Sequence, residues 1–239
     1  MIYSVIKDYL LSKKHHFCIN DATKISVIVP HPDDETIGMG GFIRKYSSNC
    51  TLMLVTNGCF GNPEYGREET IRIRNEEYGN ALAKLGVSSR CIYLGIDDRN
   101  VRKNLDRIKQ AIDEDYDYIF VPNSNDDHID HRAISKYISR LRQWGRIKST
   151  VVEYEVWTPL KRPNLFIDIS DIYRDKEEAI REYKSQLDHV AYDWGSLGLN
   201  RFRGMLNHCS YAEAYYIHKP KYDLFIEFLK KNKDRILED

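Results

Sequence analysis

Five consecutive residues, His31-Pro32-Asp33-Asp34-Glu35, combine one imidazole with three carboxylates, groups that bind metals and transfer protons. They follow the apolar run 25–29, which is typical of a buried strand in a parallel sheet. Open α/β sheets bind ligands just beyond the carboxyl ends of their strands, where this cluster would lie. Asp33 and Asp34 could instead only cap the next helix. A cap needs one short polar side chain and leaves the histidine unexplained, so we favour a metal or acid–base site.

A second loop, residues 122–131, has the same kind of composition. It follows the apolar run 118–121 and precedes a helical pattern over 132–141. His128 and His131 are three residues apart, so both point to one side of a first helical turn. Three of the eight histidines therefore fall in two acidic loops at strand ends, which makes coincidence the weaker explanation.

Together the two loops contain the groups of a metal-assisted hydrolase. Zinc in hydrolytic sites takes three nitrogen or oxygen ligands and leaves a position for water, and a mixed ligand set also admits other divalent metals. A bound cation lowers the pKa of its water, and a nearby carboxylate can then accept the proton. A histidine that titrates near neutrality can protonate the leaving group. These principles do not decide which aspartate or histidine takes which role.

The composition excludes several other classes of protein. Lys plus Arg balance Asp plus Glu at 36 each, so we expect neither a nucleic-acid partner nor an anionic membrane surface. The five cysteines are scattered without a Cys-x-x-Cys pair, which favours free thiols and a cytoplasmic location over disulfides or a cysteine zinc site. Residues 1–14 hold charges among their apolar residues, so we expect an amphipathic helix, not a signal peptide or a membrane span.

The elements that position both loops alternate along the chain, which predicts an α/β fold with a mostly parallel sheet. The predicted strands are 25–29, 50–55, 91–94 and 118–121, and the predicted helices are 38–46, 68–85, 101–116 and 132–141. The C-terminal part forms an extension with predicted strands at 150–156, 165–169 and 211–218 and predicted helices at 174–190 and 222–236. We expect the glycine-rich segment 194–208 to be irregular. No low-complexity linker divides the chain, so residues 1–239 are interpreted as a single domain.

These residues resemble the LmbE-like, or PIG-L, family of metal-dependent N-deacetylases. The resemblance covers about residues 25–217 and includes both acidic loops in the family's order. Its motifs are His-Pro-Asp-Asp-Glu at 31–35, Gly40-Gly41, Thr56-Asn57-Gly58, the Arg74-x-x-Glu77 helix, Pro122-x-x-x-Asp126-x-His128-x-Asp130-His131 and weaker matches at 176–186, 203–204 and 212–214. Ile129 departs from the family, which often has proline there, but it leaves the ligand spacing unchanged.

The resemblance implies a Rossmann-like three-layer fold and a role for each candidate residue. It implies that the zinc ligands are His31, Asp34 and His131. It further implies that Asp33 is the general base and that His128 steadies the tetrahedral centre and protonates the amine, with Asp130 orienting the His128 ring. The positions on the substrate side would be Arg74 and Asp98, although Arg74 could equally pair with Glu77 and Asp98 could be a turn residue. Asp126 and Asp97 are interpreted as loop and cap residues.

The implied reaction is hydrolysis of the acetamide of an N-acetylglucosamine-type conjugate, which gives acetate and a free amine. The sequence does not indicate the carrier, which could be a lipid, a thiol precursor, a polysaccharide or an antibiotic, nor does it indicate the oligomeric state. We expect the 59–66 loop and the 194–204 stretch to shape the rim of the pocket.

Three other functions are compatible with parts of this sequence. A dinucleotide-binding module is disfavoured because Gly38-x-Gly40 lacks the third glycine, whose place Ile43 occupies. A metal-dependent hydrolase of another bond, such as a phosphoester, could use the same site. A catalytically silent sugar-binding protein on this fold is disfavoured because Asp33 and His128 are both retained.

Overall fold

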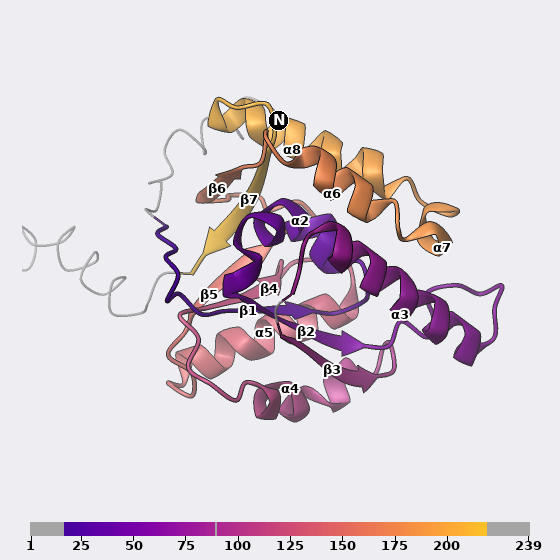
Figure 1. The fold of residues 1–239 in the computed structure, drawn as a ribbon. Coiled ribbons are helices and arrows are strands. Elements are labelled where there is room, and N and C mark those ends of the chain that lie inside the picture. Colours follow the sequence, from indigo (N-terminus) through magenta and orange to yellow (C-terminus); the bar gives the residue numbers. More distant parts are fainter. Residues whose placement is uncertain (1–16, 89, 219–239) are drawn as a thin grey trace, which may run out of the picture.

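The computed structural model describes residues 17–88 and 90–218, whose strands form one sheet in the order β3-β2-β1-β4-β5-β7-β6 (Figure 1). The strands are β1 (Ile25–Val29), β2 (Cys50–Thr56), β3 (Cys91–Ile96), β4 (Tyr118–Pro122), β5 (Thr150–Tyr154), β6 (Leu165–Asp168) and β7 (Ala212–Ile217). Strands β1 to β5 pair in parallel, whereas β7 pairs antiparallel with both β5 and β6. The prediction of an α/β fold with a mostly parallel sheet is confirmed. The helices predicted at 1–14 and 222–236 lie outside the described residues.

Helices cover both faces of the sheet and give three layers (Figure 1). They are α2 (Asp34–Tyr46), α3 (Arg67–Lys84), α4 (Leu105–Ala111), α5 (Ile129–Gln143), α6 (Tyr173–Ile180), α7 (Lys184–Leu187) and α8 (Tyr192–Asn207), with 3₁₀ turns η1 (Ser47–Asn49) and η2 (Val101–Lys103). Helices α2, α3, α6 and α8 lie on one face, and α4 and α5 on the other. Each side has its own apolar core, so strands such as β1 are buried on both faces.

Helix α2 lies close to the C-terminal part of the chain because its middle lacks side chains. A Cβ at Gly41 would lie 2.5 Å from Ile169, and a Cβ at Gly40 would lie 2.9 Å from Lys176. On the sheet side of the helix, Phe42 packs against Phe120 of β4 with ring centroids 4.8 Å apart. The helix begins at Asp34 and not at Gly38, so the acidic cluster itself forms its first turn.

One segment predicted to be irregular and two predicted helices differ in the structure. The segment predicted to be irregular forms α8, where Gly204 permits close packing: a Cβ there would lie 2.7 Å from the Ser210 carbonyl oxygen. The helix predicted over 174–190 is divided into α6 and α7, because Tyr183 turns inward and donates to Glu35 Oε1 at 2.6 Å. The helix predicted over 101–116 is shorter, since α4 ends at Ala111.

The order of the strands brings the two acidic loops together. Strand β1 lies between β2 and β4, so the chain leaves β1 towards one edge of the sheet and later returns to its other side. The loops after β1 and β4 therefore lie next to each other, and the chain leaves them in opposite directions across the sheet. Such a topological switch point is where open α/β sheets bind ligands.

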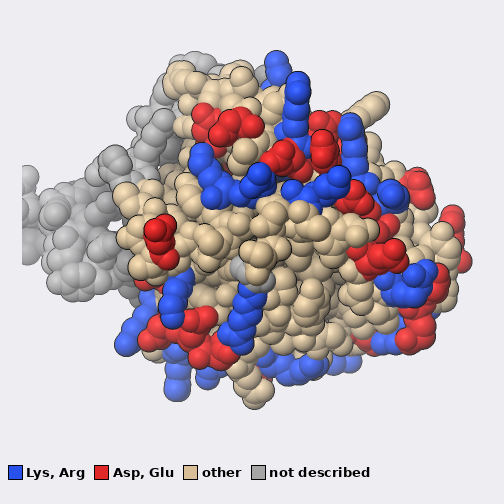
Figure 2. Space-filling view, viewed as in Figure 1, with Lys and Arg blue, Asp and Glu red and all other residues tan. Residues whose placement is uncertain are grey.

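Charged side chains of both signs are mixed over the face shown in Figure 2 and do not form a patch of one sign. This arrangement agrees with the equal numbers of acidic and basic residues in the sequence. Within residues 17–88 and 90–218, the structure has no helix that is long and apolar enough to cross a membrane.

Candidate active site

The loop after β1 presents His31, Asp33 and Asp34 in a fixed backbone conformation. Asp33 has a φ of 140°, which L-amino acids rarely adopt, and its side chain makes no capping hydrogen bond to α2. Such a residue costs of order 1–3 kcal/mol and persists where its surroundings enforce it, often at functional sites. The His31 backbone N–H donates to Asp34 Oδ2 at 2.8 Å. Asp33 is therefore not present as a simple side-chain cap.

The loop after β4 places His128 and His131 at the start of α5. His128 is the N-cap residue, and its Nδ1 accepts a hydrogen bond from the Asp130 N–H at 3.3 Å. An acceptor nitrogen carries no proton, so the proton of the neutral His128 ring is on Nε2. His131 is fully buried in the first turn of the helix.

Three atoms from the two loops that could bind a metal ion lie close together. His31 Nδ1 and His131 Nε2 each lie 3.1 Å from Asp34 Oδ2, and the two nitrogens lie 3.2 Å from each other. Ligands at about 2.0–2.1 Å from a tetrahedral ion lie about 3.3 Å apart. The side chains of His31, Asp34 and His131 thus fit a divalent cation such as zinc.

His128 is a less suitable ligand than Asp34. A set made of His31, His128 and His131 brings its ligand atoms only within 4.8 Å of one another. His128 is therefore a candidate neighbour of a bound cation and a weaker candidate ligand than Asp34.

Both candidate metal histidines have a carboxylate on their other ring nitrogen. Asp126 Oδ1 lies 3.2 Å from His131 Nδ1, and Asp130 Oδ2 lies 3.3 Å from His31 Nε2. Metal-binding histidines usually have such a partner, which fixes the orientation of the ring. The sequence interpretation gave the Asp130 carboxylate to His128, but in the structure it faces His31, and only the Asp130 backbone N–H reaches His128.

Asp126 is buried and links the second loop to the segment after β5. Its Oδ1 accepts the His128 N–H at 2.9 Å, and its Oδ2 accepts the N–H groups of Trp157 and Thr158 at 3.1 Å each. The sequence alone predicts no more than a loop residue at Asp126. Its place in the matched motif was the available signal, but its contacts come partly from a segment thirty residues away.

Electrostatics at the site favour a bound cation. Burial acts against a charge on His31, yet Asp130 and Asp34 raise its pKa to about 10. Burial also opposes ionisation of Asp34, but His131 and His31 hold its pKa well below the ordinary value. A centre that holds positive charge this strongly is suited to a divalent ion.

The pKa values of Asp33 and His128, the two candidate catalytic groups, are shifted in opposite directions. Burial raises the pKa of Asp33 to about 6 although the Arg74 guanidinium opposes this, so Asp33 is a stronger base than an ordinary aspartate. Burial and the positive charges of His31 and His131 lower the pKa of His128 to about 4, which favours its neutral form.

Arg74 is a buried residue of the site, not a helix-surface residue. Its Nη2 donates to the Pro32 carbonyl at 2.5 Å and lies 3.2 Å from Asp33 Oδ2. Glu77, its alternative partner from the sequence, instead accepts hydrogen bonds from the N–H and hydroxyl of Ser185. Among the residues described, Arg74 Nε and Nη1 have no hydrogen-bond partner.

Asp98 lies at the pocket but its carboxylate is engaged by a loop. It accepts the N–H of Gly58 at 3.1 Å and that of Phe60 at 2.9 Å. It therefore holds the start of the 59–66 loop in place. Its neighbour Asp97 bonds to Asn57 Nδ2 at 2.8 Å and to Arg67.

These residues line one open pocket at the carboxyl edge of the sheet. The lining residues expected from the sequence are His31, Asp33, Asp34, Arg74, Asp98 and His128. The sequence interpretation did not single out the others, which are Phe60, Gly61, Arg99, Trp157, Gln186 and Tyr192. The 59–66 loop contributes to the rim as expected, whereas the 194–204 stretch does not line this pocket.

Comparison with known proteins gives a family match over the part that carries both loops. Residues 26–141 match the model of the PIG-L family, described as GlcNAc-PI de-N-acetylase. The chain is 28% identical over 202 residues to a diacetylchitobiose deacetylase of Thermococcus kodakarensis, covering 73% of this chain and 74% of the relative. It is 25% identical to a probable N-acetyl-alpha-D-glucosaminyl L-malate deacetylase 2 of Bacillus cereus, covering 71% and 86%.

A solved structure with the same fold is similar over most of the chain. It is the N,N'-diacetylchitobiose deacetylase from Pyrococcus horikoshii, complexed with an inhibitor, at a TM-score of 0.66 and 27% sequence identity. The similarity covers 84% of this chain and 85% of that one.

Proposed function

We propose that this chain, whose residues 26–141 match the PIG-L family model, is a metal-dependent hydrolase that removes the acetyl group from an N-acetylglucosamine-type conjugate. The products would be acetate and a free amine. The observation that carries this proposal is the convergence of His31 Nδ1, Asp34 Oδ2 and His131 Nε2 within 3.1–3.2 Å, next in the chain to the Asp33 carboxylate, which pairs with Arg74. Two of the similar proteins are deacetylases of amino sugars by name, which supports the substrate class.

His31, Asp34 and His131 would hold the ion, for which zinc suits the mixed nitrogen and oxygen ligands. When bound, the ion supplies a water of lowered pKa and polarises the acetamide carbonyl. Asp126 and Asp130 would keep the two imidazoles oriented, each through the ring nitrogen that does not face Asp34.

Asp33 is the proposed general base. Asp33 lies in the chain between the candidate ligands His31 and Asp34. Its carboxylate nevertheless pairs with Arg74 and not with the side chains of these ligands. Its raised pKa suits it to accept a proton from the attacking water. The proton taken up by Asp33 can then pass to the departing amine, so that the base ends the reaction ionised.

His128 is proposed to stabilise the negative oxygen that develops when water attacks the acetamide carbonyl. Its Nδ1 is an acceptor for the Asp130 N–H, so the neutral ring presents the Nε2–H as a donor. A donor that meets an oxygen as negative charge develops there stabilises the transition state. The alternative role, in which His128 protonates the amine, would require a proton on Nδ1 against the Asp130 N–H.

Arg74, which lines the catalytic pocket, is a proposed substrate-binding residue. Its guanidinium lies beside Asp33 in this pocket, where its positive charge can attract polar groups of a sugar. Asp98 would contribute to substrate binding through the loop that it holds, since Gly58 and Phe60 already occupy its carboxylate.

Acetate release tests the proposal. Enzyme with added zinc should release acetate and an equal amount of amine from at least one of a panel of N-acetylglucosamine conjugates. Exhaustive chelation should abolish the activity, and added metal should restore it. Full activity after chelation, or phosphate release from phosphoesters without any acetate release, would contradict the proposal.

A further inference from the structure

An apolar pocket adjoins the catalytic pocket and has no part in the mechanism above. Its cavity volume is about 170 Å³, and it lies between the start of α2, the loop after β5 and α8. Trp157 and Tyr192 line both pockets and so form the wall between them. Their rings meet edge to face, with centroids 5.5 Å apart. A molecule bound at the catalytic pocket could therefore extend across these two rings into the second pocket.

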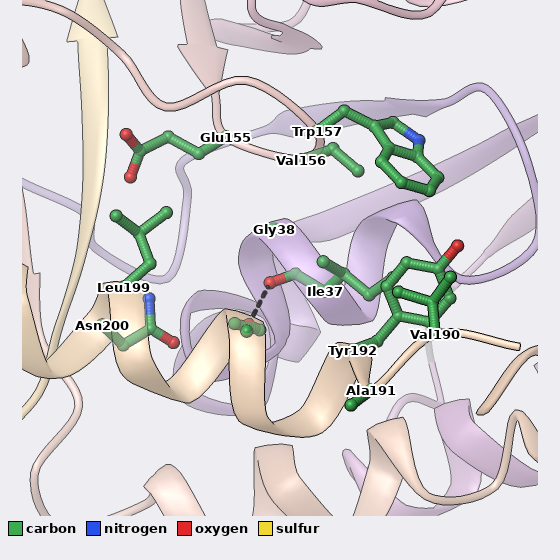
Figure 3. A pocket seen from close by; sticks show the side chains of 12 residues that line it. Ile37, Gly38, Glu155, Val156, Trp157, Val190, Ala191, Tyr192, Leu199 and Asn200 are labelled. Atoms are coloured by element: carbon green, nitrogen blue, oxygen red, sulfur yellow. Dashed lines mark hydrogen bonds between the residues drawn. The ribbon is translucent and has the colours of Figure 1, made fainter.

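Figure 3 shows the arrangement of the walls. Trp157 and Tyr192 stand at one end of the pocket, and Leu199 and Asn200 stand at the other. The large side chains along the walls are apolar, namely Ile37, Val156, Trp157, Val190, Tyr192 and Leu199. Trp157 is 48% exposed and Val190 is 41% exposed, so both offer apolar surface that a ligand would remove from water.

The polar groups of this pocket leave little for a charged or hydroxyl-rich ligand. Ser196 Oγ already donates to the Ile37 carbonyl at 2.8 Å (Figure 3). The Glu155 carboxylate is engaged by Arg203 and by the Leu160 N–H. None of the described residues that line the pocket is Lys, Arg or His.

One polar atom of the pocket lining is left without a partner. Asn200 is 5% exposed, and its Oδ1 has no hydrogen-bond partner among the residues that the structure describes. A buried carbonyl of this kind is costly unless a donor reaches it. A ligand that carries a single donor next to an apolar group would suit this end of the pocket.

We propose that this pocket binds a flat apolar ring in the carrier of the amino sugar, such as an aryl aglycone. The proposal rests on the proposed function, because the carrier is defined relative to the acetamide held in the catalytic pocket. An apolar cavity of about 150 Å³ can bind benzene, so a cavity of this size holds one aromatic ring. Trp157 and Tyr192 supply ring edges and faces for such a group.

Two glycosides and one matched pair of variants test the pocket. The phenyl glycoside of N-acetylglucosamine should have a KM about 10-fold lower than the methyl glycoside. A Cβ at Gly195 or at Gly198 meets nothing within 4 Å, so a side chain can begin at either position of α8 without a clash at its Cβ. Gly195 lines the pocket and Gly198 does not. Gly195→Leu should bring the ratio of the two kcat/KM values to about 1, whereas Gly198→Leu should leave the ratio unchanged.

Several outcomes would overturn the proposal. One is an equal kcat/KM for both glycosides in the wild type, and another is an unchanged ratio in Gly195→Leu. If the enzyme prefers an octyl glycoside over the phenyl glycoside, the pocket binds an alkyl chain and not an aromatic ring. A preference for N-benzoyl over N-acetyl glucosamine that Gly195→Leu abolishes would place the pocket on the acyl side.

Failure of the proposed function can be told apart from failure of the pocket. If no glycoside releases acetate with metal present, the deacetylase proposal fails. Calorimetric binding of the phenyl glycoside to the wild type and to Gly195→Leu still tests the pocket in that case. Binding that is at least 10-fold weaker in the variant supports the proposal, and equal binding contradicts it.

Discussion

The carboxylate of Asp126 lies 3.2 Å from Nδ1 of His131, on the opposite edge of the ring from the Nε2 that faces Asp34. Both Asp126 and His131 are fully buried. The same carboxylate holds the N–H groups of Trp157 and Thr158, so it joins a candidate metal ligand to the wall of the substrate pocket. Metal affinity and the position of Trp157 should therefore depend on one side chain.

Asp126→Asn should weaken metal binding about 10–100-fold, because the amide supports the His131 imidazole less well than a carboxylate does. Metal titration of the metal-free protein measures this change. The matched control is Asp127→Asn, which changes the neighbouring exposed aspartate and should leave affinity unchanged. Equal affinity in both variants would show that Asp126 does not act through His131.

Asp33 and Asp34 are adjacent but should fail in different ways. Asp33→Asn removes the proton acceptor and keeps the size, so turnover should fall roughly 10²–10⁴-fold with metal content retained. Asp34→Asn should lose metal and activity together, because Asp34 Oδ2 faces both His31 and His131. Elemental analysis beside steady-state kinetics separates the two effects. A metal-free Asp33→Asn protein would mean that the two roles must be exchanged.

Substitutions of the two histidines of the second loop should also have different effects. His131→Ala should lose metal, whereas His128→Ala should keep it and lose about 10²–10³-fold in kcat, as expected when one donor to a developing oxyanion is removed. His128→Gln retains an N–H donor and should recover part of the loss. Loss of metal from His128→Ala would instead make His128 a ligand.

The strands and the ligand loops could be predicted because their signals are local. The run 25–29 is apolar except for Ser26 because both faces of β1 are buried, and the acids and histidines lie in the loops that follow the strands. Helix α8 was missed because Gly195, Gly198 and Gly204 are typical of turns, whereas Gly204 serves close packing against Ser210. Propensity is a weak signal where tertiary contacts decide.

The rest of the pocket depends on contacts between distant segments. Trp157 and Tyr192 are single aromatic residues in stretches without a motif, and only the folded chain brings their rings together. The orientation of the Asp130 carboxylate towards His31 joins residues ninety-nine positions apart. No spacing along the sequence indicates such a contact. The sequence therefore favoured His128, which is close to Asp130 in the chain, as the partner of the Asp130 carboxylate.

A buried ion pair beneath α2 gives the last prediction. Glu213 of β7 accepts the N–H groups of Gly41 and Phe42 at 2.8 and 2.7 Å, and its Oε1 lies 2.7 Å from Lys176 Nζ. Lys176 and Glu213 are both 0% exposed. The pair therefore fixes the middle of the helix whose first turn carries Asp34.

Glu213→Gln should lower the free energy of unfolding by about 3–5 kcal/mol, because it leaves the Lys176 ammonium buried without a counter-charge. Urea denaturation measures this loss. The matched control is Lys84→Gln, which breaks a pair with Glu178 whose side chains are 47% and 64% exposed, and it should leave the unfolding midpoint unchanged. Glu213→Gln combined with Lys176→Met should recover much of the stability, since no buried charge remains. If the double variant is as unstable as Glu213→Gln alone, the hydrogen bonds to Gly41 and Phe42, and not the ion pair, hold α2 in place.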